Sequence, residues 1–154
     1  MITGKTFLEF FAGVGLVNLG LRSSGWECVY ANDISEKKTE MYLDQFPSAT
    51  HYHCEDIWKT ESVLEHISER AMLATASFPC IDLSLAGQMR GLDGKHSGTL
   101  FGFIRVMQRL KERGLMPPVV MLENVVGLVS GKSGEEFKKT CHAVTELGYY
   151  IDAL

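Results

Sequence analysis

A cysteine and a glutamate stand at the ends of two apolar segments, where each side chain could do chemistry. Cys80 directly follows Pro79 and the apolar residues 72–78, and a polar, glycine-bearing segment comes next. Glu123 lies near the end of the strongly apolar residues 117–125. A thiol in this position is placed as a nucleophile, and a carboxyl group taken out of water tends to hold a proton. The two residues therefore predict covalent catalysis supported by an acid.

Two glycines and two aspartates indicate an adenosine-containing cofactor. Gly13 and Gly15 follow an apolar segment, and Asp33 lies about 20 residues further on, the spacing of an acid that binds a ribose diol. A dinucleotide fingerprint would have glycine or alanine where this chain has Asn18, so a pyrophosphate is not clearly provided for. A cofactor without phosphates, such as S-adenosylmethionine, fits better, with Asp33 at the ribose and Asp56 at the adenine amino group. An ordinary strand-to-helix turn followed by two helix-capping acids remains open.

The segments around these side chains alternate between strand and helix patterns. Strands are predicted at residues 5–10, 27–33, 49–57, 72–78, 117–125 and 149–154, and helices at 16–25, 35–46, 61–71, 98–114 and 133–148. The alternation predicts an α/β fold with a doubly wound, mostly parallel sheet, in which residues 1–154 form one catalytic and cofactor-binding domain. In such sheets ligands bind beyond the carboxyl ends of the strands, where the candidate residues lie. Leu16, Leu19 and Leu21 suit the first helix, and Ser35 is expected to cap the second.

Composition narrows the class of protein. The chain has 154 residues, of which 45% are hydrophobic and 22% charged, which is enough apolar material for a sizeable core. No segment approaches the roughly 18 apolar residues of a membrane span, and the first residues lack the layout of a secretory signal. We therefore expect no membrane partner, and a cytoplasmic location in a bacterium or phage host, or a nuclear one in a eukaryote. The four cysteines form no C-x-x-C pair, which fits reduced thiols.

Charge and metal-ligand spacing exclude two broad functions. The net charge of -4 argues against a grip on nucleic acid by the whole surface. The glycine-rich residues 84–98 carry three potentially cationic side chains, Arg90 among them, and are expected to move and to meet phosphate; a solvated connection is the alternative. A metal site is not expected, because strand alternation would send His53 and Cys54, which follow His51, to opposite faces.

Four segments, FFAGVGL, FPCIDLS, GTLF and LENV, resemble the cytosine-5 DNA methyltransferase family in their order and spacing, over essentially the whole chain. The resemblance implies a Rossmann-like, S-adenosylmethionine-dependent methyltransferase fold and methyl transfer to carbon 5 of a cytosine flipped out of double-stranded DNA. It implies that Cys80 is the nucleophile and that Glu123 contacts the ring edge. The implied cofactor contacts are Phe11, Ala12, Gly13, Gly15, Asp33, Ile34, Asp56, Ile57, Pro79 and Leu100, and the substrate contacts are Ser84, Arg90 and Asn124.

The chain departs from the family pattern at three places. Leu16 replaces the second glycine of the usual G-x-G-G turn, and Glu55 stands where a glycine commonly precedes the adenine-binding acid. Ser97 replaces the arginine usually found before GTL, which removes a charge at the end of the loop.

The family's downstream Gln-x-Arg-x-Arg segment and target-recognition region have no counterpart in this sequence. We therefore expect the N-terminal catalytic part of a longer enzyme, with the C-terminal region or a companion chain as partner. An artificial truncation, a gene fragment and one half of a split enzyme all remain open. An RNA-directed cytosine-5 methyltransferase and an inactive fragment that binds the cofactor or a partner chain are the alternative functions.

Overall fold

The computed structural model describes residues 4–79, 98–130 and 134–153. Within these residues a five-stranded sheet, with every pair of neighbours parallel, has the order β3-β2-β1-β4-β5. The strands are β1 Thr6–Phe10, β2 Glu27–Asp33, β3 Tyr52–Cys54, β4 Leu73–Ala76 and β5 Val119–Leu122. The helices are α1 Leu16–Arg22, α2 Glu36–Gln45, α3 Thr60–Glu65, α4 Thr99–Glu112, α5 Gly127–Ser130 and α6 Glu135–Leu147. The predicted doubly wound, parallel α/β fold is confirmed.

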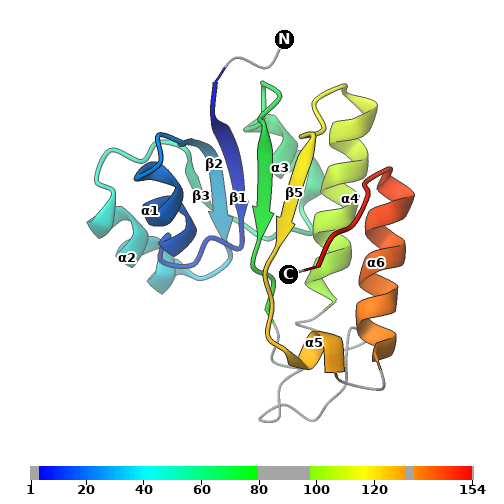
Figure 1. Cartoon of the computed structure of the whole chain (residues 1–154). Helices are drawn as coiled ribbons and strands as arrows, with labels where there is room; N and C mark the ends of the chain where they lie inside the picture. The colour runs from blue at the N-terminus through cyan, green and yellow to red at the C-terminus, as the bar shows by residue number, and fades with distance from the viewer. Residues whose placement is uncertain (1–3, 80–97, 131–133, 154) are drawn as a thin grey trace.

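The direction in which the chain builds the sheet reverses between β1 and β4. From β1 the chain adds β2 and then β3 on one side, and it returns to add β4 and β5 on the other side. Figure 1 shows the two halves, with α1 and α2 beside β1 to β3 and with α4 and α6 beside β5. In sheets of this kind the reversal opens a crevice beyond the carboxyl ends of the two central strands. The fold thus places one ligand-binding position next to the ends of β1 and β4.

Two apolar clusters cover the two faces of the sheet. One joins Phe7 and Ala31 of the sheet to Tyr42 of α2 and to the aromatic residues near it. The larger one joins Leu8 and Phe10 to the inward sides of α3, α4 and α6. The first cluster does not extend over β5, where Val119 and Met121 are half exposed. β5 is therefore covered on one face only.

Some predicted elements are wrong or shorter than expected. The sixth strand predicted at residues 149–154 is absent, because the described residues 149–153 form no strand. Instead, the phenol of Tyr149 donates a hydrogen bond to the carbonyl of Pro117, just before β5. A side chain, and not a strand pairing, therefore connects this segment to the start of β5. The third helix stops at Glu65 rather than at residue 71, and α5 was not predicted at all. Within the described part of the chain, no helix is long and apolar enough to span a membrane.

The first helix is also less apolar in its packing than its leucines predict. Leu16 and Leu19 are 69% and 48% exposed, and the buried residue of α1 is Asn18. The second helix agrees with the prediction, because the Ser35 hydroxyl accepts a hydrogen bond from the backbone N–H of Lys38 at its N-terminus. Of the three leucines, Leu21 packs against the first cluster. The α1 side of the core therefore also contains a polar group, Asn18, that the periodicity did not predict.

A buried polar network joins β1, α1 and α2 around that asparagine. Glu9 is 1% exposed, and its Oε1 accepts a hydrogen bond from the N–H of Asn18 at 3.2 Å. The Asn18 amide donates to the Tyr42 hydroxyl at 2.7 Å, which in turn lies 3.1 Å from Nε2 of His51. Burial raises the pKa of Glu9 from 4.5 to about 7, and the Asn18 N–H partly offsets the rise. Burial lowers the pKa of His51. The network therefore contains an acid that charges near neutral pH.

We expect Glu9→Gln to remove part of the pH dependence of stability. Because the unfolded chain loses this proton near pH 4.5 and the folded chain only near pH 7, the stability due to neutral Glu9 is complete below pH 4.5 and is lost as pH rises through about 7. The difference amounts to about 3 kcal/mol. Urea unfolding at about pH 5 and about pH 8 should show the wild-type protein losing that much more stability than the variant.

Glu61→Gln, at an exposed carboxylate, is the matched control and should leave the pH dependence unchanged. Equal losses of stability in the wild-type protein and in Glu9→Gln would contradict the prediction.

Candidate active site

The turn after β1 has an uncommon backbone conformation. Phe11, Gly13 and Gly15 all have positive φ values, of 58°, 58° and 84°. The left-handed region is natural for glycine and uncommon for other residues, so Phe11 is held there by its surroundings. The N–H of Ala12 donates to the carbonyl of Asn32 at 2.8 Å, which ties the turn to the end of β2. The glycines predicted to meet the cofactor thus lie in a tight turn next to the end of a neighbouring strand.

Gly15 is required by the packing of α2 as well as by its φ value. A Cβ at this position would lie 2.7 Å from ring atoms of both Phe46 and Tyr42. We expect Gly15→Ala to lower the free energy of unfolding by about 2–5 kcal/mol, because left-handed strain and overpacking act together. Chemical denaturation measures the loss, and calorimetry with S-adenosylmethionine should show binding weakened by about tenfold or more.

Gly20→Ala is the matched control, since a Cβ there meets nothing within 4 Å and the position is helical. It should be neutral or stabilise the protein by up to about 1 kcal/mol. A Gly15→Ala protein as stable as Gly20→Ala would show that the turn tolerates a side chain.

Asp33 joins the glycine turn to the second helix. Its Oδ2 accepts hydrogen bonds from the N–H of Gly13 at 3.0 Å and from the ammonium of Lys38 at 3.3 Å. Its Oδ1 accepts from the N–H of Ser35 at 3.0 Å. The N-cap of α2 is Ser35 itself, so Asp33 is not the cap. Gly13 and Asp33, paired in the sequence by spacing alone, are in direct contact.

The segment after β3 continues the edge on which Asp33 lies. The N–H of Glu55 donates to the Asp33 carbonyl at 3.1 Å, which places the next acid, Asp56, at the neighbouring strand end. Oδ1 of Asp56 accepts from the N–H of Trp58 at 3.0 Å, and the N-cap of α3 is Lys59. Asp56 therefore shapes the turn that leads into α3 without being the cap of that helix.

Apolar residues predicted to contact the cofactor differ in their exposure. Ile34, directly after Asp33, is 67% exposed, whereas Ile57 and Leu100 are buried. Gly102 of α4 packs on Ile57, because a Cβ at Gly102 would lie only 2.8 Å from Ile57 Cγ2. The first turns of α4, which carry Leu100, thus lie close to the segment that carries Asp56. Ile34 is therefore an exposed apolar side chain directly after Asp33.

The side chain of Asn124, which was predicted to contact the substrate, joins the ends of β4 and β5 in the structure. The Asn124 amide donates to the carbonyl of Phe78 at 2.9 Å, and its oxygen accepts from the N–H of Val125 at 3.0 Å. The N–H of Glu123 donates to the carbonyl of Ala76 at 3.1 Å. Asn124, expected to contact the substrate, therefore fixes the segment before Pro79 against β5.

Glu123 is exposed at the end of β5, so the expectation of a carboxyl group taken out of water is wrong for the described structure. It nevertheless lies at the strand end next to β4, which leads to the part-buried Pro79. Cys80, Ser84 and Arg90 lie outside the described residues. The roles assigned to all of these residues stay predictions.

The carboxylates and the apolar side chain at the strand ends fit a nucleoside cofactor without phosphates. Asp33 and Asp56 stand at the carboxyl ends of the adjacent strands β2 and β3, and Asn18 stands where a dinucleotide fingerprint has glycine or alanine. Carboxylates accept hydrogen bonds from ribose hydroxyls and from an amino group, and they attract a positively charged sulfonium. The exposed Ile34 offers an apolar surface for a base. These residues match the chemistry of S-adenosylmethionine better than that of a dinucleotide.

The histidines considered for a metal site point to different partners. His51 contacts Tyr42, whereas His53 stacks between Tyr30 and His66, with ring centroids 5.6 and 3.7 Å away. Cys54 is exposed. Among the described residues no three His, Cys, Asp or Glu side chains form a group that could hold a metal ion.

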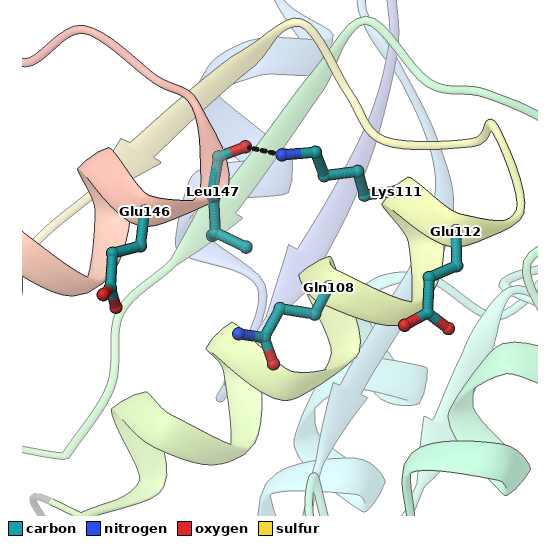
Figure 2. Close-up of a pocket in the computed structure, with 5 residues that line it drawn as sticks. All are labelled: Gln108, Lys111, Glu112, Glu146 and Leu147. Atoms are coloured by element: carbon teal, nitrogen blue, oxygen red, sulfur yellow. Dashed lines mark hydrogen bonds between the residues drawn. The ribbon is translucent and has the colours of Figure 1, made fainter.

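A groove away from these strand ends lies between the C-terminal ends of α4 and α6. Figure 2 shows its lining, in which the Lys111 ammonium donates to the carbonyl of Leu147 at 2.7 Å. Gln108, Glu112 and Glu146 complete the lining. Both helices run from the site end of the molecule to the opposite end, so this groove is remote from the glycine turn (Figure 1). The Lys111 contact closes the end of α6 and takes no part in the site.

The fold defines a class, namely α/β proteins in which ligands bind at the reversal point of a parallel sheet. The family model described as C-5 cytosine-specific DNA methylase matches residues 5–153. The chain therefore belongs to the C-5 cytosine-specific DNA methylase family.

Relatives of known name agree with this family. Type II methyltransferase M.HhaI of Haemophilus parahaemolyticus is 28% identical over 99% of this chain and 43% of its own length. The DNA-cytosine methyltransferase of Escherichia coli K12 is 30% identical over 94% of this chain and 35% of its own. The chain thus spans less than half the length of these relatives.

Solved structures share the fold. The match with the Entamoeba histolytica methyltransferase EhMeth covers 97% of this chain and 46% of the EhMeth chain, with a TM-score of 0.71 and 18% identity. The match with the S. pombe Dnmt2 methyltransferase covers 91% of this chain and 40% of the Dnmt2 chain, with a TM-score of 0.64 and 19% identity.

Proposed function

We propose that the protein transfers a methyl group from S-adenosylmethionine to carbon 5 of cytosine in double-stranded DNA. The observation that carries the proposal is the order of three strand ends. The segment leading to Pro79 leaves β4, between the glycine turn of β1 and the Glu123 end of β5. A nucleophile after Pro79 would therefore stand between a cofactor position and an acid.

The cofactor would be held by the ends of β1, β2 and β3. Asp33, already bonded to the N–H of Gly13, would accept a hydrogen bond from a ribose hydroxyl, and Asp56 one from the adenine amino group. Ile34 and the part-buried Phe11 would contact the apolar faces of the ligand. When bound, S-adenosylmethionine supplies a methyl group on a positively charged sulfur.

The chemistry on the base needs a thiolate and an acid. Carbon 5 of cytosine is a weak nucleophile, but it becomes enamine-like when the Cys80 thiolate forms a bond to carbon 6. Glu123 would hold a proton at N3 and so accept the charge that builds up on the ring. After carbon 5 takes the methyl group, its proton leaves to a base and the bond to Cys80 breaks. The thiolate is restored.

The target base must leave the duplex to reach these groups, and we propose that residues 84–98, including Ser84 and Arg90, contact the flipped base and its phosphates. Sequence recognition would come from a C-terminal region or a companion chain, with residues 1–154 as an incomplete catalytic domain. We place the reaction in the cytoplasm. Methylation of an RNA by the same groups is the competing function.

Transfer of labelled methyl to duplex DNA, compared with transfer RNA, tests the proposal in the full-length enzyme. We expect label in a cytosine-containing duplex and none in transfer RNA. Label in transfer RNA alone would favour the RNA enzyme. Cofactor binding without label in either would leave only a binding function.

A further inference from the structure

Glu55, one of the departures from the family pattern, has all of its polar atoms in hydrogen bonds. Its Oε1 accepts from the hydroxyl of Tyr30 on β2 at 2.7 Å. Its Oε2 accepts from the hydroxyl of Ser62 in α3 at 2.9 Å. One carboxylate therefore joins the sheet to the helix that follows the Asp56 segment.

The backbone of Glu55 is held as well as its side chain. Its N–H donates to the Asp33 carbonyl at 3.1 Å, and its carbonyl accepts from the Asn32 amide at 3.3 Å. Asn32 is almost fully buried, so this bond is shielded from water. Four hydrogen bonds, with Tyr30, Ser62, Asn32 and Asp33, therefore hold Glu55, the residue directly before Asp56.

Residues 55–59, which lead from β3 into α3, are closely packed against α4. Ile57 is buried against α4, where Gly102 leaves no room for a Cβ. The N–H groups of Trp58 and Lys59 donate to Asp56, at its Oδ1 and at its carbonyl. The turn is therefore held from the sheet side by Glu55 and from the helix side by Ile57, with Asp56 between them.

We propose that Glu55 is a positioning residue that sets the orientation of Asp56 toward the adenine of the cofactor. The inference rests on the proposed function, since it requires Asp56 to accept the adenine amino hydrogen. A carboxylate suits the task because both Tyr30 and Ser62 present donors, and a carboxylate accepts at both oxygens. Burial and the neighbouring Glu55 charge raise the pKa of Tyr30, so its hydroxyl remains a donor throughout the physiological range.

The test measures preference for adenine rather than affinity alone. In the full-length enzyme, calorimetry compares S-adenosylhomocysteine with its 6-oxo analogue, S-inosylhomocysteine, which lacks the amino group. We expect Glu55→Ala to reduce the wild-type preference for the adenine ligand by about tenfold, because the acceptor is no longer held in place. Glu55→Gln keeps one acceptor and gains a donor that can bond a hydroxyl oxygen, so it should retain most of the preference.

A second readout needs no ligand. Hydrogen exchange of the Trp58 and Lys59 amides reports the Asp56 turn directly, and we expect it to be about tenfold faster in Glu55→Ala. Glu61→Ala is the matched control, because it also removes a nearby carboxylate, which lies in α3 and pairs with Arg109 and Arg113 instead. It should leave both the preference and the exchange unchanged.

The outcomes separate the two hypotheses. Equal weakening of both ligands in Glu55→Ala, or unchanged exchange at Trp58 and Lys59, would overturn the role of Glu55 while leaving the proposed function intact. A wild-type protein that binds neither ligand would overturn the cofactor assignment. One that binds both equally would overturn the contact of Asp56 with the adenine amino group, and either result would remove the role of Glu55.

Discussion

Cys80→Ser is expected to lower methyl transfer to duplex DNA by at least about 10⁴-fold, with little change in folding or in cofactor affinity. A serine hydroxyl is a far weaker nucleophile than a thiolate, and no covalent bond to carbon 6 would form at a useful rate. Radiolabel transfer under single-turnover conditions measures the loss, and calorimetry with S-adenosylmethionine measures binding.

Duplex DNA with 5-fluorocytosine at the target gives an independent readout of the same step. Fluorine cannot leave carbon 5 as a proton does, so the adduct with Cys80 should accumulate in the wild-type protein and be absent from Cys80→Ser. Cys54→Ser, at an exposed cysteine on β3, is the control and should still form the adduct. Retained activity in Cys80→Ser together with a lower melting temperature would make Cys80 a structural residue.

Glu123→Gln is expected to slow the chemical step by roughly 10²–10⁴-fold, the usual contribution of a positioned acid or base. The amide keeps the size and hydrogen-bonding capacity of the side chain but has no carboxyl proton to hold at N3. Because Glu123 is exposed and its backbone N–H makes the contact to Ala76, folding should be unchanged. Single-turnover transfer separates this effect from product release.

Glu69→Gln, another exposed carboxylate on the described surface, serves as the control and should transfer methyl at the wild-type rate. An unchanged single-turnover rate in Glu123→Gln would mean that another group handles the proton.

The sequence predicted the strands, their alternation with helices and the parallel sheet, because these follow from local pattern. The alternation of short apolar runs with amphipathic helices predicted β1 to β5. The Gly13 to Asp33 spacing indicated a shared role, and the structure adds a direct hydrogen bond between the two residues. The strand predicted at residues 149–154 is wrong because its apolar pattern does not specify a partner. In the structure Tyr149 bonds to Pro117 through its phenol instead.

The polar contacts within the site could not be predicted from pattern. The resemblance assigned Asn124 to the substrate, and the sequence pattern did not show that its amide also joins the ends of β4 and β5. Glu55 was noticed only as a replacement for glycine, since its partners Tyr30 and Ser62 are distant along the chain. Such contacts depend on tertiary neighbours, and a single sequence carries no signal for them.

The pairing of the central strands has a consequence for the order in which the site forms during folding. Phe7 of β1 pairs with Leu73 of β4, and Thr6 of β1 pairs with Glu27 of β2. The residues of the first pair are about three times as far apart along the chain as those of the second. Closing the longer loop costs about 1 kcal/mol more, and distant parallel pairings form slowly. The contact of Gly13 with Asp33 needs only the earlier pairing of β1 with β2. We therefore expect the cofactor side to be structured first and to serve as the surface on which the cysteine-bearing half assembles.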